Sequence, residues 1–210
     1  MKRLLIFLLS SFLLFSCAPA AQPVSQTEVL KVYATFAARP WFTELYACAE
    51  KFPVVLNVNG DAPDIYLRIG EPEVIVSPAY KIDEEEILIA TNRGSPLQNL
   101  TLQEAQALFA EGNPSAQVWV YSSDADLQIV FDRLVMKGRS VTSSAKVALS
   151  AQNMSDILNS ESNAVGILPR HWKAGTVRDV FSAGVVPVLV ITKDEPVGAV
   201  SQLISCLQSN

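Results

Sequence analysis

The pattern of apolar and polar positions predicts a chain that alternates between strands and helices. Leu30–Thr35 (LKVYAT) predicts a strand, and Trp41, Leu45 and Cys48 recur after it at helical spacing. Two runs rich in β-branched and aromatic residues follow, PVVLNV and DIYLRI, and they are typical of short strands. This alternation indicates an α/β fold built around a parallel sheet.

The clearest single helix is predicted between Thr101 and Gly112. Thr101 followed three residues later by Glu104 forms a capping box, and Gly112 stands where a helix C-terminal cap belongs. By the same reasoning we expect strands at 85–92, 116–122, 164–169 and 185–192, and helices at 125–138, 143–150, 153–160 and 196–208.

The N-terminus has the features of an export signal. Lys2 and Arg3 precede the apolar run LLIFLLSSFLLF, which is too short to span a bilayer as a helix. Leu14–Cys17 resembles the lipobox of bacterial lipoproteins, which implies cleavage before Cys17 and acylation of that cysteine. Residues 1–17 would then be the lipoprotein signal and 18–27 a flexible tether. The alternative is an ordinary secretory signal that is cut near the sequence APAA, with Cys17 incidental.

Charge and composition narrow the range of partners. The chain of 210 residues has a formal net charge of −5, and without Lys2 and Arg3 there remain 14 of its 16 basic residues against 21 acidic ones, a charge of −7. Nucleic acid and anionic lipid headgroups are therefore poor candidate partners. Half of the residues are apolar, so the chain can bury a core of one domain or of two small lobes.

Cys48 and Cys206 are the two cysteines that follow the signal. In an exported protein such a pair favours a disulfide over a metal site, because metal sites need three or four clustered ligands and the chain has a single histidine. Two separate buried thiols are the alternative. We expect no metal and no cofactor.

The order of motifs resembles the substrate-binding proteins of phosphate-type ABC transporters, which have the type 2 periplasmic-binding-protein fold. The motifs are VYATFAARPWFTELY, EILIATNRGSPLQNLTLQEAQALFAEG, VWVYSSDADLQIVF, SNAVGILPRHWKAG and VPVLVITKDEP. The resemblance covers nearly the whole mature chain. It implies a two-lobe α/β fold with a mixed, mainly parallel sheet in each lobe. The first lobe would hold about 28–80 plus the C-terminal segment and the second about 85–170, so the helices that carry Cys48 and Cys206 would share a lobe.

The resemblance also implies an oxyanion site in the cleft, formed by two loops. Thr35 and Phe36 lie in the first loop, where the Thr35 hydroxyl can donate to a ligand or merely cap a strand end. The family's second loop reads arginine, serine, glycine, threonine, whereas this chain has no arginine there and carries Ser122, Ser123, Asp124 and Asp126.

Carboxylates beside a bound dianion are unfavourable, so tight phosphate binding is not expected from this second loop. We favour Ser123 or Asp124 as the N-cap of the following helix over direct ligand contact. If the loop does bind a ligand, an amine-bearing or hydroxylated solute suits it. The family's middle loop, between VVLNVNGDAP and DIYLRIGEP, is also missing.

The leading hypothesis is a monomeric solute-binding protein, held outside the cytoplasm by lipid on Cys17, that delivers a small solute to the membrane permease of an ABC transporter. An enzyme is not expected, because His171 reads as a partly exposed loop residue and no nucleophile motif is present. The acidic run Asp83–Glu86 reads as a solvated turn. The runner-up is a sensor or interaction module of the same fold that transports no solute.

Overall fold

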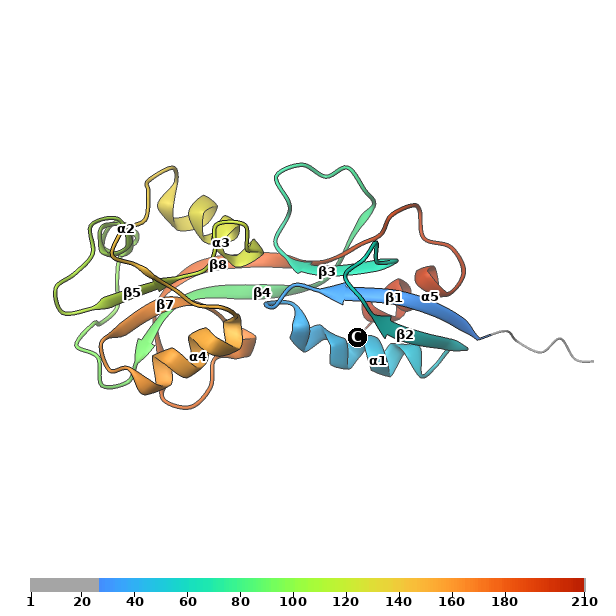
Figure 1. The fold of residues 1–210 in the computed structure, drawn as a ribbon, viewed down its shortest axis with the longest axis horizontal. Coiled ribbons are helices and arrows are strands. Elements are labelled where there is room, and N and C mark those ends of the chain that lie inside the picture. Colours follow the sequence, from blue (N-terminus) through green and yellow to red (C-terminus); the bar gives the residue numbers. More distant parts are fainter. Residues whose placement is uncertain (1–26, 210) are drawn as a thin grey trace, which may run out of the picture.

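The computed structural model describes residues 27–209, which form two lobes on one continuous eight-stranded sheet (Figure 1). The strand order is β2-β1-β3-β8-β4-β7-β5-β6. The predicted export signal, Cys17 and nearly all of the tether lie outside the described residues. Within residues 27–209, no helix combines the length and the apolar character needed to cross a bilayer.

The first lobe is a small parallel sheet with helices on one face. β1 pairs in parallel with both β2 and β3. Leu30, Val32 and Ala34 are buried and alternate with exposed neighbours, because successive side chains of a strand point to opposite faces. In Figure 1, α1 lies below the strands of this sheet and α5 lies behind them. The elements are β1 (Glu28–Ala34), η1 (Arg39–Trp41), α1 (Phe42–Ala49), β2 (Val54–Val58), β3 (Ile65–Ile69) and α5 (Gly198–Leu207).

A disulfide joins the two helices of this lobe. Cys48 in α1 and Cys206 in α5, the pair expected to be bridged, have an S–S distance of 2.08 Å and a Cα–Cα distance of 5.9 Å. The bridge connects positions 158 residues apart. It therefore ties the beginning of the described chain to its end.

The second lobe has helices on both faces of its part of the sheet (Figure 1). All six residues of β7 are buried, as expected for a strand covered on two sides. The predicted capping box is confirmed, since the Thr101 hydroxyl accepts from the Glu104 N–H and the Glu104 carboxylate accepts from the Thr101 N–H at 2.7 Å. The elements are α2 (Leu102–Glu111), β5 (Gln117–Val120), α3 (Asp126–Phe131), the π-helical turn η2 (Asp132–Met136), β6 (Lys146–Val147), α4 (Ala151–Ser160), β7 (Ala164–Pro169) and η3 (Arg170–Trp172).

Two long strands run through both lobes and hold them together. β4 (Ala79–Asn92) and β8 (Val177–Ile191) are antiparallel partners along nearly their whole length. The pairs within each lobe that do not involve β4 or β8 are parallel. The predicted class, a two-lobe α/β fold with a mixed sheet, is therefore confirmed.

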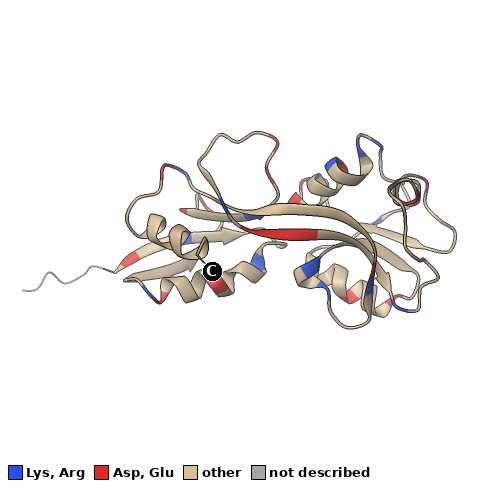
Figure 2. Ribbon diagram, turned by 180° about the vertical axis from the view of Figure 1, so that it is seen from behind, with Lys and Arg blue, Asp and Glu red and all other residues tan. Residues whose placement is uncertain are grey.

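Two local predictions are wrong. Asp83–Glu86 is not a solvated turn but part of β4, where it forms the acidic stretch across the middle of Figure 2. The alternation of a strand directs Glu85 inward, and this residue is only 1% exposed. The predicted helix 143–150 is also absent, because Thr142 and Ser144 hydrogen-bond each other in a turn and Lys146–Val147 pairs with β5 as an edge strand.

Candidate binding cleft

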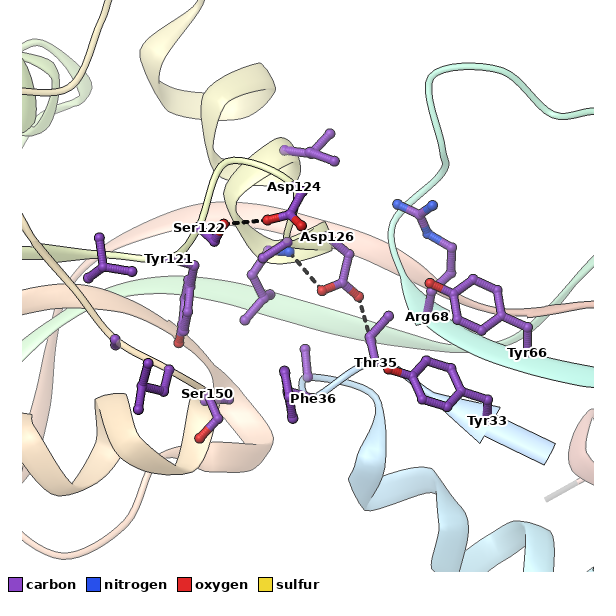
Figure 3. Close-up of a pocket in the computed structure, with 18 residues that line it drawn as sticks. Tyr33, Thr35, Phe36, Tyr66, Arg68, Tyr121, Ser122, Asp124, Asp126 and Ser150 are labelled. Carbon is purple, nitrogen blue, oxygen red and sulfur yellow. Dashed lines mark hydrogen bonds between the residues drawn. The ribbon is translucent and has the colours of Figure 1, made fainter. Parts of the chain in front are cut away.

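The first loop of the candidate site follows β1 and turns back at Thr35. The Thr35 N–H donates to the Leu67 carbonyl of β3 at 3.0 Å, and the Ala38 N–H donates to the Thr35 carbonyl at 3.1 Å. These bonds fix the turn. The Thr35 side chain points toward the second lobe, where its hydroxyl donates to Asp126 at 2.6 Å (Figure 3).

The second loop, between β5 and α3, is held in position by a hydrogen bond to the side chain of Gln128 in α3. The Gln128 Oε1 accepts the Tyr121 N–H at 3.0 Å, and the Tyr121 hydroxyl donates to the Ile167 carbonyl at 2.8 Å. The predicted cap is wrong, because Ala125 is the N-cap residue and no side chain caps α3. Asp124 is instead exposed and accepts a hydrogen bond from the Ser122 hydroxyl, which lowers the pKa of its carboxyl.

Asp126 links the two lobes. Its Oδ2 accepts from the Thr35 hydroxyl at 2.6 Å and from the Ile69 N–H at 3.0 Å, and its Oδ1 accepts from the Leu127 N–H at 2.9 Å. Thr35 directly follows β1 and Ile69 ends β3, both in the first lobe, whereas Asp126 begins α3 of the second. The carboxylate is 7% exposed, so these three donors satisfy a group that would be costly to bury unpaired.

Around this link lies a cavity of about 430 Å³ whose walls come from both lobes (Figure 3). The sequence-predicted residues Thr35, Phe36, Ser122, Asp124 and Asp126 all line it, and Ser123 does not. Tertiary folding therefore brings together two loops that are nearly ninety positions apart in the chain. The remaining lining residues are Tyr33, Ala37, Tyr66, Arg68, Tyr121, Ala125, Leu127, Ile129, Val147, Ala148, Leu149, Ser150 and Ala151.

Arg68 is the charged residue of the cavity wall that was not predicted from the sequence. It lies in β3, is 9% exposed, and its Nε and Nη2 are buried without a hydrogen-bond acceptor among residues 27–209. The signal in the sequence was a single charged residue inside the run IYLRI, whose other members are apolar or aromatic. An arginine in such a run is unusual, because charged side chains are seldom buried without a partner.

Two aromatic residues of the first lobe flank this arginine. The rings of Tyr33 and Tyr66 are stacked, with centroids 5.8 Å apart. Burial raises the pKa of the Tyr66 hydroxyl, while the Arg68 charge works in the opposite direction. Tyr66 is therefore a neutral hydroxyl at ordinary pH and can donate or accept a hydrogen bond.

A second buried carboxylate lies where the long strands pass from one lobe to the other. Glu85 Oε2 lies 2.6 Å from the His171 Nδ1, and the His171 ring packs on the Trp41 ring with centroids 4.6 Å apart. Burial raises the pKa of the Glu85 carboxyl, and the neighbouring His171 partly offsets this. His171 is half exposed, as expected, but it also contacts both Glu85 of β4 and Trp41 of the first lobe.

Trp172 makes a further contact between the lobes. Its Nε1 donates to the Ala37 carbonyl of the first loop at 3.0 Å.

Within residues 27–209 no group of three or more histidine, cysteine or carboxylate side chains could hold a metal ion. The cleft offers hydroxyls, the carboxylates of Asp124 and Asp126, one cation and apolar surface, all of which can contact a solute.

The architecture is that of a type 2 periplasmic-binding-protein fold. No protein-family model matches the chain, and no curated protein matches it in sequence. Solved structures do match. A phosphate ABC transporter substrate-binding protein with bound phosphate from Clostridium perfringens is similar, with a TM-score of 0.75, 14% identity, and coverage of 86% of this chain and 93% of that one.

Regulatory domains share the same fold. The CcmR regulatory domain of Synechocystis, in complex with 2-PG, matches with a TM-score of 0.65 and 14% identity, covering 87% of this chain and 96% of that one. The OxyR2 regulatory domain of Vibrio vulnificus matches with a TM-score of 0.66 and 10% identity, covering 90% and 99%. At these identities the likeness shows the fold alone.

Proposed function

We propose that this chain is a lipid-anchored extracytoplasmic solute-binding protein that delivers a small solute to the permease of an ABC transporter. The observation that carries the proposal is the cavity of about 430 Å³ whose walls come from both lobes. A ligand that touches both walls is bound more tightly when the lobes are closed, and hinge closure is a common way to bind a solute. The similar protein from Clostridium perfringens is a transporter binding protein with bound phosphate.

The anchor and the lobe limits belong to the same proposal. The lipobox-like sequence that ends at Cys17 supports export and acylation, which would hold the molecule at the outer surface of a membrane. We divide the folded part into a first lobe of about 28–80 plus the C-terminal segment and a second lobe of about 85–170. The sequence and the fold together favour a solute-binding protein over an enzyme.

We infer further that the oxyanion site implied by the family resemblance is altered in this chain. A hydroxyl and two backbone N–H groups near helix and strand ends are typical donors to a bound anion. Here those donors, from Thr35, Ile69 and Leu127, all bind the carboxylate of Asp126. The protein's own side chain thus takes the place of an anionic ligand, and Thr35, Phe36, Ser122 and Asp124 remain candidate contacts for a solute.

A thermal-shift titration tests the proposal directly. The full chain, purified in a nonionic detergent, is melted with phosphate, sulfate, molybdate, amino acids, polyamines and sugars. A solute that binds only the folded state raises the Tm. We expect at least one organic solute to do so and phosphate to have no effect. A Tm increase with phosphate would contradict the altered anion site, and no increase with any solute would contradict the solute-binding role.

A sensor or interaction module is the second candidate. Asp126 already joins the lobes without a solute, and regulatory domains share the fold. Trp172 distinguishes the two functions, because its indole donates to Ala37 across the lobe boundary. Solute-driven movement of the lobes should change the tryptophan fluorescence. A module without a solute should show constant fluorescence throughout the same titration.

A further inference from the structure

Arg68 is a buried cation without an anion. The side chain is nine-tenths buried, and its Nε and Nη2 have no acceptor among the described residues. A guanidinium stays charged at any physiological pH, so it cannot escape burial by losing a proton. Buried charges are normally paired, because the loss of hydration is costly. The unpaired guanidinium therefore marks a place for a negative group.

The protein's own carboxylates do not fill that place. Asp126 lines the same cavity, but both of its oxygens already accept hydrogen bonds from the Thr35 hydroxyl and from backbone N–H groups. Asp124 accepts from the Ser122 hydroxyl at the rim. No ion pair joins Arg68 to an acidic side chain anywhere between residues 27 and 209. From the sequence, these aspartates suit an amine-bearing or hydroxylated solute if the loop binds one, whereas in the structure the cation Arg68 is the unsatisfied group.

The rest of the cavity combines hydroxyls and the carboxylates of Asp124 and Asp126 with an apolar part, and it is larger than an inorganic anion needs. Phe36 of the first lobe is 49% exposed, and Val147 and Leu149 of the second lobe are 54% and 80% exposed, although all three line the cavity. Exposed apolar side chains that face each other across a cleft favour an apolar ligand. The volume of about 430 Å³ falls within the range of sites for organic molecules, which is roughly 300 to 1,000 Å³.

We propose that the cleft binds an organic anion, with its carboxylate, phosphate or sulfonate group on Arg68 and its apolar or aromatic body between Phe36, Val147 and Leu149. This inference rests on the proposed solute-binding function and specifies its solute class. The Arg68 Nε and Nη2 are closed to solvent in this arrangement of the lobes, so the anionic group would reach these two parallel N–H donors only as the lobes move. Lysine does not offer this geometry. The stacked rings of Tyr33 and Tyr66 form the polar-aromatic edge of the same wall.

Isothermal titration calorimetry on the full chain in nonionic detergent tests the proposal with defined probes. Phenylacetate and phenyl phosphate carry the anion on an aromatic body, phenylacetamide is the matched neutral probe, and inorganic phosphate is the anion without a body. We expect both aromatic anions to bind about tenfold or more tightly than phenylacetamide, since a charged hydrogen bond is lost with the amide. Inorganic phosphate should bind more weakly than phenyl phosphate.

Matched variants assign the effect to the arginine. Arg68→Met should weaken binding of both aromatic anions by about tenfold or more, whereas Arg139→Met, which removes an equal charge from an exposed position, should leave it unchanged. Arg68→Lys keeps the charge but not the two parallel donors, so it should retain intermediate affinity. Thermal melts of each variant verify folding, and Arg68→Lys decides the question if Arg68→Met does not fold.

Several results would overturn the inference. Equal binding of phenylacetate and phenylacetamide would remove the role of the anion, and unchanged binding by Arg68→Met would remove the role of Arg68. If no aromatic anion binds but a polyamine or a sugar raises the Tm, the organic-anion inference fails and the solute-binding function stands. If no solute of any class raises the Tm, both fail together.

Discussion

Two buried carboxylates lie at the boundary between the lobes, and they differ in the groups that bind them. Asp126 at the cleft is 7% exposed and accepts hydrogen bonds from a hydroxyl and two backbone N–H groups. Glu85, between the lobes on β4, is 1% exposed and contacts the imidazole of His171. The donors at the cleft are a hydroxyl and backbone N–H groups, whereas Glu85 faces an imidazole ring.

This difference separates the tasks of the two links. The Asp126 link joins residues of different lobes, so it breaks when the lobes move apart. The Glu85 contact lies on β4, which pairs with β8 along nearly its whole length, and burial raises the pKa of the Glu85 carboxyl. The following predictions test this contrast, starting with the largest expected effect.

Removal of the disulfide tests whether solute binding at the cleft depends on the stability that the bridge contributes to the whole chain. The Cys48→Ser/Cys206→Ser variant should lower the free energy of unfolding by about 4 kcal/mol, because the bridge closes a loop of more than a hundred residues. Urea unfolding of the full chain measures this loss. Solute binding under folding conditions should not change, and a loss of binding in the folded variant would show that the cleft depends on the bridge.

Asp126→Ala removes the link at the cleft. The Ile69 N–H and the Thr35 hydroxyl lose their acceptor, so the free energy of unfolding should fall by about 2 to 3 kcal/mol. Asp124→Ala is the matched control on the same loop, and its exposed position limits the expected change to about 0.5 kcal/mol. Equal losses in both variants would mean that Asp126 acts through the loop and not through the lobe contact.

Asp126→Gly should create a site for an inorganic anion. It frees the donors of Thr35, Ile69 and Leu127, so phosphate should stabilise this variant by about 1.4 kcal/mol at ten times its Kd while leaving the unaltered protein unchanged. Thermal melts with increasing phosphate measure the gain. Absence of any stabilisation would show that these donors do not form an anion site once the carboxylate is gone.

Glu85→Gln should change the pH dependence of stability. Because burial raises the pKa of Glu85 in the folded chain above its ordinary value of 4.5, the folded state holds the proton more strongly than the unfolded state. The stability contributed by this residue therefore falls as the pH rises above about 4.5, until the folded carboxyl has ionised. Relative to the unaltered protein, Glu85→Gln should therefore gain stability as the pH rises above about 4.5.

The control for the pH experiment is the neighbouring carboxylate. Glu84→Gln changes an exposed side chain whose surface contact with Lys81 contributes little to stability. Its difference from the unaltered protein should stay nearly constant over the same pH range in urea unfolding. A stability difference for Glu85→Gln that moves in the opposite direction would show that His171 dominates over burial.

Local signals in the sequence were sufficient for much of the fold. The capping box at Thr101 and Glu104 and the apolar spacing of 164–169 gave elements that the structure confirms, because their causes lie within a few residues. Asp83–Glu86 misled the prediction, since an acidic run is usually solvated and only the partner His171, some ninety residues away, makes Glu85 compatible with burial. The length of β4 was missed for that reason.

Some residues of the candidate site could be predicted from the sequence, but the contacts between them could not. The resemblance directed attention to Thr35 and Asp126, but their mutual hydrogen bond depends on the placement of two lobes and no local pattern specifies it. Arg68 was missed because a strand pattern assigns faces to residues without showing what lies opposite. Buried unpaired groups become visible only when their surroundings are known.

The disulfide between α1 and α5 has a consequence for proteolysis. Because Cys48 and Cys206 enclose most of the folded chain in one covalent ring, a single backbone cut at any position between them leaves the two pieces joined. A nicked molecule should migrate as one band on a non-reducing gel and separate into two fragments after reduction. A protein exposed to proteases outside the cytoplasm would thus survive a first cut in any loop of its second lobe as one covalent molecule.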